Sequence, residues 1–255
     1  MRTAGIDIGS ITTKAAVVED GRILGTKVIF TGYNVEFAAR KVFDELLANL
    51  EIEPSTLGRI ISTGYGRNSV SFADKAMTEI ICHGAGAHFL NRSVRTVIDV
   101  GGQDSKALVV DTLGMVKDFV MNDKCAAGTG RFLEVMARAL EVNLDGFGAL
   151  SLNAHDPSRI SSICTVFAES EVISLISKGE KRDNIIAGIH ESVASRVYAM
   201  AQRVKAEPPI MMTGGVAKNI GVVKALEAKF NSPIEVNDLA QVNGAIGAAV
   251  LAAKM

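Results

Sequence analysis

The chain has 255 residues, enough for one large domain or for two lobes. Hydrophobic residues make up 48% and charged residues 22%, the composition of a soluble globular protein, and the formal net charge of -1 offers no concentrated basic face for nucleic acid. No apolar run approaches the roughly 20 residues that span a bilayer, and no signal-peptide pattern follows Met1, so we expect a cytoplasmic protein that binds neither membrane nor nucleic acid.

A motif at the start of the chain recurs further along. Residues 6–18 read IDIGSITTKAAVV and residues 98–110 read IDVGGQDSKALVV, so that a shift of 92 positions aligns Asp7 with Asp99. Each copy is a short apolar strand, a glycine-centred turn and a second apolar strand, which is typical of a β-hairpin. The period is far too long for a solenoid. The repeat therefore predicts two related lobes that each open with the same hairpin.

Helix-like and strand-like segments alternate through the rest of the chain, which predicts an α/β fold with covered sheets. Apolar side chains at helical spacing predict helices, and short apolar runs that end in glycine predict strands. The predicted helices cover 37–50, 131–140 and 183–204, and the predicted strands and turns cover 59–64 and 210–217. We expect a first lobe at 1–95, a second at 96–239, and a C-terminal helix at 240–255 that packs back on the first.

The two hairpins have the chemistry of a nucleotide site. Asp7 and Asp99 each lie in a strand directly before a glycine turn, where a carboxylate is costly unless it meets a cation or hydrogen-bond donors. Glycine turns let the backbone aim N–H groups at an anion, and two carboxylates with phosphate oxygens and water suit Mg²⁺. Ordinary hairpin turns are the alternative. There is no G-x-x-x-x-G-K-[ST] motif, so the chain is not a P-loop protein.

The three cysteines do not form a disulfide framework in a reducing compartment. Cys125 lies in a loop of small residues before a predicted helix, and Cys164 precedes another, where a helix N-terminus favours a thiolate or an anionic cluster. Cys82 lies in an apolar run, and we expect it to be a buried helix residue. Two copies of the chain would offer four thiolates from Cys125 and Cys164 to one cluster, but zinc, a catalytic thiol and inert cysteines remain open on these grounds.

The hairpin layout resembles the actin, sugar-kinase and heat-shock-chaperone ATPase superfamily. The resemblance implies an α/β fold of two duplicated ribonuclease-H-like lobes with a nucleotide cleft between them. It makes Asp7 a catalytic residue, and either Gln103 or Asp104 the residue that orients the attacking water. Asp7 and Asp99 would hold magnesium through water. The residues expected to bind ATP are Gly9, Ser10, Thr12, Thr13, Lys14, Asp99, Gly101, Gly102, Gly214, Gly215, Lys218 and Gln241.

A second resemblance covers essentially the whole chain. The runs around the cysteines are similar to the cluster signatures of the 2-hydroxyacyl-CoA dehydratase activators, a family related to the ATPase subunits of benzoyl-CoA reductase. The runs that carry it are MNDKCAAGTGRF (121–132), CTVFAESEVIS (164–174), DNIIAGIH (183–190), SVASRV (192–197) and TGYGRN (63–68).

This resemblance implies a homodimer bridged by one 4Fe-4S cluster, which Cys125 and Cys164 of each chain would hold. Each chain would bind MgATP, a ferredoxin or flavodoxin would supply the electron, and ATP hydrolysis would drive it to a partner dehydratase or related acyl-CoA enzyme. Two rival interpretations remain. A small-molecule kinase or regulatory ATPase of the same superfamily would need no cluster, and a zinc-stabilised binding module would not hydrolyse ATP.

Overall fold

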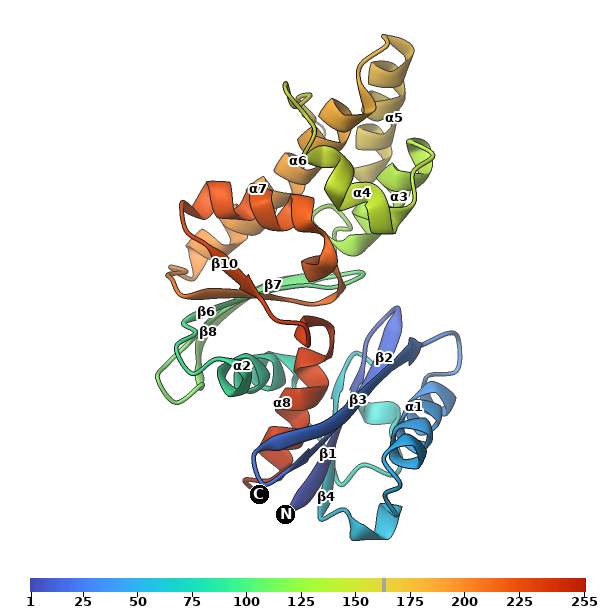
Figure 1. The fold of residues 1–255 in the computed structure, drawn as a ribbon, viewed down its shortest axis with the longest axis vertical. Coiled ribbons are helices and arrows are strands. Elements are labelled where there is room, and N and C mark those ends of the chain that lie inside the picture. Colours follow the sequence, from blue (N-terminus) through green and yellow to red (C-terminus); the bar gives the residue numbers. More distant parts are fainter. Residues whose placement is uncertain (162–163) are drawn as a thin grey trace. The chain divides into compact units, whose positions relative to one another are not determined.

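The computed structural model describes residues 1–161 and 164–255. Ser162 and Ile163, part of the polar-to-apolar run before Cys164, lie outside the described residues. The described chain contains two five-stranded sheets, with strand orders β3-β2-β1-β4-β5 and β8-β7-β6-β9-β10 (Figure 1). Each strand of the first sheet has its counterpart five strands later in the second. This shared order confirms the duplication predicted from the repeated hairpin.

The first sheet begins with the predicted hairpin. β1 pairs antiparallel with β2, and the register places Asp7 opposite Lys14. β1 also pairs in parallel with β4, which places Asp7 beside Thr63. The strands of this sheet are β1 (Arg2–Ile8), β2 (Thr12–Glu19), β3 (Arg22–Phe30), β4 (Arg59–Gly64) and β5 (Lys75–Ala76).

Helices cover both faces of the first sheet. α1 (Val35–Asn49) buries Val42, Phe43 and Leu46 against alternate residues of β1, because strand side chains point to opposite faces in turn. On the other face lies α8 (Asn243–Ala252), a helix of small residues that also packs against α2 (Glu79–Leu90). A Cβ on Gly5 would lie 2.1 Å from the Ala245 carbonyl oxygen, so the close approach of α8 to β1 depends on glycine.

The second sheet and its helices carry the cysteine runs. The sheet consists of β6 (Thr96–Val100), β7 (Ser105–Val110), β8 (Val116–Asn122), β9 (Ile210–Thr213) and β10 (Ile234–Val236). The helices are α3 (Gly130–Ala139), α4 (Leu144–Ser151), α5 (Thr165–Ser177), α6 (Arg182–Arg203) and α7 (Ile220–Phe230). The helices predicted at 131–140 and 183–204 are therefore present within one residue at each end.

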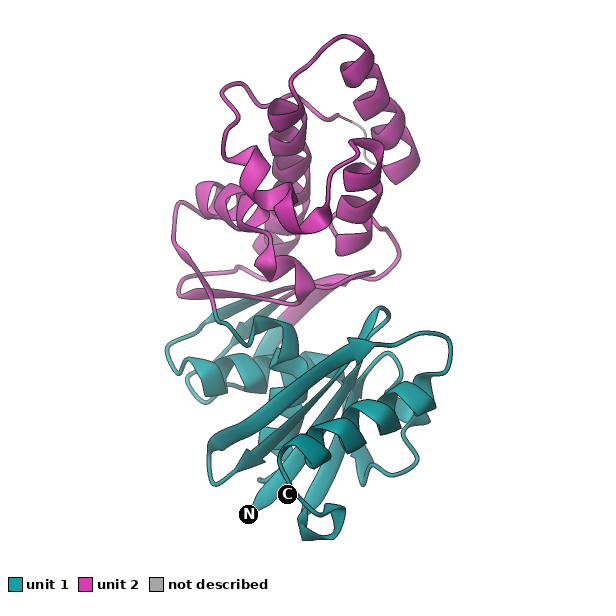
Figure 2. Cartoon of the chain, turned by 45° about the vertical axis from the view of Figure 1, so that its right-hand side comes forward, with its two compact units in different colours: residues 1–97, 108–118, 237–255 teal, residues 98–107, 119–236 magenta. Residues whose placement is uncertain are grey.

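The chain divides into two compact units (Figure 2). The boundaries between the units fall within β6, β7 and β8 of the second sheet. The C-terminal helix α8 belongs to the same unit as the N-terminus. Unit 1 comprises Met1–Val97, Leu108–Asp118 and Asn237–Met255, and unit 2 comprises Ile98–Ala107 and Phe119–Val236. None of the described helices combines the length and the apolar character needed to cross a bilayer.

Candidate functional site

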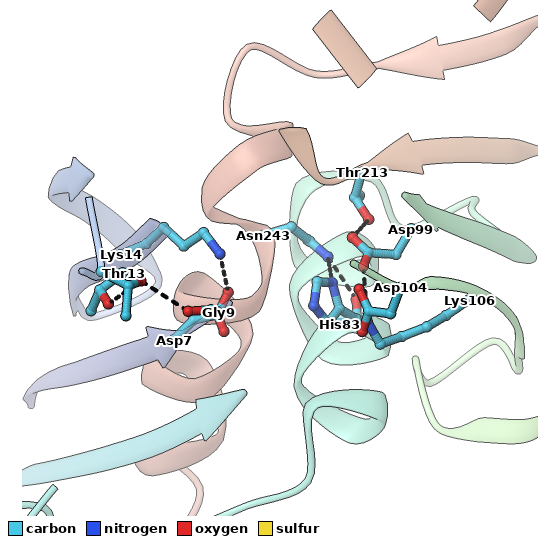
Figure 3. A network of polar contacts seen from close by, with 11 residues as sticks. Asp7, Gly9, Thr13, Lys14, His83, Asp99, Asp104, Lys106, Thr213 and Asn243 are labelled. Carbon is cyan, nitrogen blue, oxygen red and sulfur yellow. Dashed lines mark hydrogen bonds and ion pairs between the residues drawn. The ribbon is translucent and has the colours of Figure 1, made fainter. Parts of the chain in front are cut away.

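In unit 1, Asp7 is a buried carboxylate in a tight setting. It lies one residue from the end of β1, is 5% exposed, and forms an ion pair with Lys14, whose Nζ is 3.2 Å from Oδ2 (Figure 3). Gly64 has a φ of +84°, and a Cβ there would lie 2.5 Å from Asp7 Oδ1; a Cβ on Gly244 would lie 2.9 Å from Oδ2. Two backbones thus pass so close to the carboxylate that only glycine fits at these two positions.

The tip of the first hairpin is braced from within. The Thr13 and Thr31 hydroxyls are 2.9 Å apart, and the Thr31 hydroxyl donates to the Gly9 carbonyl oxygen at 2.9 Å. Thr13 is fully buried, so its hydroxyl fixes the turn, whereas Ser10 and Thr12 are half-buried at the tip. Ser10 and Thr12 are therefore the hydroxyls better placed to reach a phosphate, and Thr31 is a positioning residue that sequence reasoning missed.

A second buried pair, His83 and Asn243, lies near Asp7. The Asn243 amide nitrogen is 3.0 Å from the His83 carbonyl oxygen and 3.3 Å from His83 Nδ1. A Cβ on Gly244 would lie 3.1 Å from His83 Nε2 as well as 2.9 Å from Asp7 Oδ2, which places the imidazole beside the carboxylate. Because His83 and Asn243 are 160 residues apart, only the packing of α8 on α2 brings them together.

In unit 2, the second hairpin contains a buried ionic cluster of three residues, Asp99, Asp104 and Lys106. Lys106 Nζ lies 3.3 Å from Asp99 Oδ2 and 2.5 Å from Asp104 Oδ2, and all three side chains are less than a tenth exposed. The Thr213 hydroxyl at the end of β9 donates to Asp99 Oδ1 at 2.8 Å (Figure 3). One cation between two carboxylates leaves a formal charge of -1, which fits a divalent cation with phosphate ligands.

The remaining predicted nucleotide residues differ in exposure. Gln103 is exposed, whereas Asp104 is buried and engaged with Lys106. Gly214 has a φ of +87°, and a Cβ there would lie 2.4 Å from the Val100 carbonyl oxygen, so the turn after β9 requires glycine. Lys218 is exposed in the turn that precedes α7. Gly215 is also exposed, Gly101 and Gly102 are half-buried, and Gln241 is half-buried in unit 1.

Cys125 and Cys164 are exposed free thiols in unit 2. Cys125 lies in the loop between β8 and α3, where the Asn122 side chain binds both its N–H at 3.3 Å and its carbonyl oxygen at 2.8 Å. Cys164 is the residue directly before α5, and α3 packs against α5. Among the described residues of one chain, no three His, Cys, Asp or Glu side chains are grouped to hold a metal ion.

Cys82 differs from the other two cysteines. It is fully buried in α2, which confirms the expectation for this residue. Burial raises the pKa of its thiol to about 12, so it stays protonated at neutral pH. Cys82 therefore lacks the thiolate character that a metal ligand needs.

The start of α3 is hydrogen-bonded to the glycine turn of the second hairpin, between β6 and β7. The Gly130 N–H donates to the Gly101 carbonyl oxygen and the Arg131 N–H to that of Gly102, both at 2.8 Å. These are N–H groups that a helix leaves without an intrahelical partner. The sequence suggested that this helix end would stabilise an anion at Cys125, whereas the structure gives these two donors to the glycine turn.

The fold agrees with the comparisons to known proteins. A family model described as the BadF/BadG/BcrA/BcrD ATPase family matches residues 4–252. The chain belongs to this ATPase family. It is 48% identical over 99% of its length to the (R)-2-hydroxyglutaryl-CoA dehydratase activating ATPase of Acidaminococcus fermentans, and 47% identical over 99% to the activator of lactoyl-CoA dehydratase of Anaerotignum propionicum; each alignment covers 97% of the relative. It is also 33% identical over 97% of its length to one of the subunits of benzoyl-CoA reductase from Thauera aromatica, of which 92% is covered.

Solved structures place this family member in the predicted fold. Component A of the A. fermentans dehydratase matches with a TM-score of 0.96 at 47% identity, covering 100% of this chain and 98% of that one. The activator of 2-hydroxyisocaproyl-CoA dehydratase from Clostridium difficile, with bound ADPNP, matches with a TM-score of 0.93 at 43% identity, covering 99% and 94%. A glucokinase of the ROK family from Streptomyces griseus, at 14% identity and a TM-score of 0.62 over 100% of both chains, has the same fold, which confirms the predicted fold class.

Proposed function

We propose that this ATPase hydrolyses MgATP to drive one electron into a partner 2-hydroxyacyl-CoA dehydratase or a related acyl-CoA enzyme. The nucleotide half rests on the paired elements: Asp7 with Lys14, and Asp99 with Lys106, occupy equivalent positions in the repeat. Asp7 and Asp99 hold magnesium through water, while Lys14 and the tip hydroxyls contact phosphate. A relative 43% identical carries bound ADPNP, which supports ATP as the ligand.

Gln103 is the better candidate to orient the attacking water. Asp104 is 5% exposed and its Oδ2 lies 2.5 Å from Lys106, so its carboxylate is committed to an internal ion pair. A Cβ on Gly101 would also lie 2.5 Å from Asp104 Oδ1, so the carboxylate folds back over its own turn. Gln103 is exposed, and its amide can both donate and accept a hydrogen bond. Asp104 then shapes the turn from which Gln103 acts.

The redox half rests on one observation: the two exposed thiols precede two helices that pack against each other. One chain offers two thiols, and a second copy related by a two-fold axis offers the four that a 4Fe-4S cluster takes. α5, directly after Cys164, exposes Val166, Phe167 and Ile173, each more than half exposed. Apolar side chains on an exposed helix are typical of an interface, and this supports the homodimer. When bound, the cluster supplies a site that holds one electron.

The names of the relatives support the class of the partner enzyme, whereas the electron donor is inferred from the resemblance of the cysteine runs. Two relatives 47% and 48% identical carry names of dehydratase activators, and their lengths match this chain almost completely. We infer a partner of the same class, and a ferredoxin or flavodoxin as the electron donor. The N–H groups of Gly130 and Arg131 donate to the Gly101 and Gly102 carbonyl oxygens. These hydrogen bonds connect the glycine turn of the second hairpin to the helix that follows the Cys125 loop.

The first test is anaerobic purification followed by an absorption spectrum and by iron and sulfide counts. We expect a brown dimer with about four irons, the content of one Cys₄ cluster. The colour should be lost in Cys125→Ala and in Cys164→Ala. Cys82→Ala is the matched control and should keep the cluster, because Cys82 is buried and protonated.

The nucleotide half is tested separately. Asp7→Asn should abolish ATP turnover and leave the cluster content unchanged. A colourless wild-type protein that still hydrolyses ATP under strict anaerobic handling would reject the redox half and favour a kinase or regulatory ATPase. Bound zinc without turnover would reject both halves.

A further inference from the structure

Unit 1 contains a cavity that none of the nucleotide or cysteine residues line. Its volume is about 410 Å³, within the range of small-molecule sites. Its lining residues come from α2, from α8 and the residues after it, from the turn between β7 and β8 with the start of β8, and from the end of β2 with the turn after it. Three lining residues carry nitrogen in their side chains, namely His88, Arg92 and Lys254, and all the others are apolar residues or glycines.

Hydrogen bonds and close packing fix the turn between β7 and β8, which forms one wall of the cavity. Asp111 accepts hydrogen bonds from the N–H groups of Leu113 and Met115, both at 2.9 Å, and these bonds lower the pKa of its carboxyl. Gly114 of the same turn has a φ of +78°, and a Cβ there would lie 2.6 Å from His88, so the turn packs directly on the imidazole. The turn thereby presents Leu113 and Met115, which are 71% and 62% exposed, beside the cavity.

The charge in and around the cavity is positive. Arg92 and Lys254 are exposed at its edge. Burial lowers the pKa of His88, and the charges of Arg92 and Lys254 lower it further, while the more weakly felt Asp111 opposes them. His88 is 6% exposed, and its Nδ1 has no hydrogen-bond partner among the described residues. Buried polar atoms are normally partnered, so this nitrogen is an unpaired polar atom in an otherwise apolar wall.

We propose that this cavity binds a carboxylate with an aliphatic body, of medium-chain fatty-acid type, independently of the nucleotide. The chain lies against Ile81, Phe89 and Leu251, and the carboxylate faces Arg92 and Lys254. An arginine and a lysine at the edge of an apolar cavity complement a molecule that is anionic at one end and apolar at the other. A neutral chain lacks the anionic end, and a sugar lacks the apolar body.

The test is a saturation-transfer NMR titration of the full-length protein with octanoate, and with octan-1-ol as the uncharged match. Octanoate should bind one site per chain and several-fold more tightly than octan-1-ol, because its carboxylate forms exposed ion pairs with Arg92 and Lys254, each of which contributes modestly. The double variant Arg92→Ser/Lys254→Ser should bind both molecules equally. Lys229→Ser, which removes an exposed lysine on α7 of unit 2, should change nothing.

A second variant separates the cavity from the rest of the surface. Ala253 lines the cavity but is itself exposed, so Ala253→Trp fills the mouth without disturbing the core. It should remove binding of both molecules and leave the unfolding transition and ATP turnover unchanged. Equal binding of octanoate and octan-1-ol by the wild type, undiminished binding by Ala253→Trp, or no saturable binding would each overturn the proposal.

Discussion

Removing the cation from the Asp99–Lys106–Asp104 cluster should destabilise unit 2 strongly. Lys106→Met keeps most of the side-chain volume and leaves two carboxylates in a buried site, each formerly within 3.3 Å of Nζ. Breaking a buried ion pair by deleting one partner costs about 3–5 kcal/mol, because the remaining charge is left uncompensated. The Lys106 side chain is only 3% exposed, so its ion pairs are buried pairs and not surface pairs, which contribute about 0–1 kcal/mol.

The assay is denaturant unfolding followed by circular dichroism, in wild type and in Lys106→Met. The measured quantity is the stability deficit of the variant, that is, the difference in the free energy of unfolding between the two proteins. Millimolar Mg²⁺ should reduce the deficit if Asp99 faces the metal position. The triple variant Asp99→Asn/Asp104→Asn/Lys106→Met, which has no charge in the cluster, should recover most of the lost stability.

Two results would refute this reasoning. A deficit below about 1 kcal/mol would mean that water reaches the cluster and screens it as at a surface. A triple variant no more stable than Lys106→Met would mean that the loss comes from packing and not from charge.

Three further predictions concern single positions. The stability of the wild type, relative to His190→Gln, should fall by about 2 kcal/mol between about pH 7 and about pH 5. Burial lowers the pKa of His190 to about 4, so in this range the unfolded chain, with a pKa near 6.5, takes up a proton that the folded chain does not. Gly64→Ala should abolish ATP turnover by displacing Asp7 and cost about 1–3 kcal/mol in denaturant unfolding, more than the control Gly32→Ala, which shares a positive φ but has open space around it. In the cluster-free protein, iodoacetamide should label two cysteines and spare Cys82 until the chain unfolds; labelling of all three in the native state would contradict its burial.

Most of the fold could be predicted from the repeated hairpin and from the helical periodicity of the apolar residues. The spacing of buried residues placed α6 and α3 within one residue of their observed ends, because one long apolar face decides a helix. The hairpin pattern correctly predicted that Asp7 and Asp99 lie near strand ends, because a glycine turn directly after an apolar run marks where the strand stops. The cysteine roles came from resemblance, since the chemistry of two isolated thiols left zinc, a catalytic thiol, inert cysteines and a cluster all open.

What the sequence did not reveal depends on contacts between distant segments. Thr31 and the pair His83 and Asn243 reach the Asp7 element only after the sheet and α8 have packed. Lys106 is different, since a signal existed. In both copies a lysine follows the aspartate by seven residues across a hairpin, and that spacing placed the first pair directly opposite in the β1–β2 ladder. A lysine in an apolar strand is read by default as exposed, and this default hid the buried ion pair.

The Asp99–Lys106–Asp104 ionic cluster leaves the turn of the second hairpin free to hydrogen-bond the start of α3. Lys106 and Thr213 fix Asp99 from two sides, so the strand end is held by side chains and its following turn is left with free backbone carbonyls. α3 uses those of Gly101 and Gly102 to complete its first turn, which ties the helix after Cys125 to the glycine turn by two 2.8 Å hydrogen bonds. Any shift of that turn must either move the start of α3 or leave two helix N–H groups unpaired, at a cost of about 1–3 kcal/mol for each that stays buried. Moving the helix costs less free energy, so we expect the glycine turn and the start of α3 to move together.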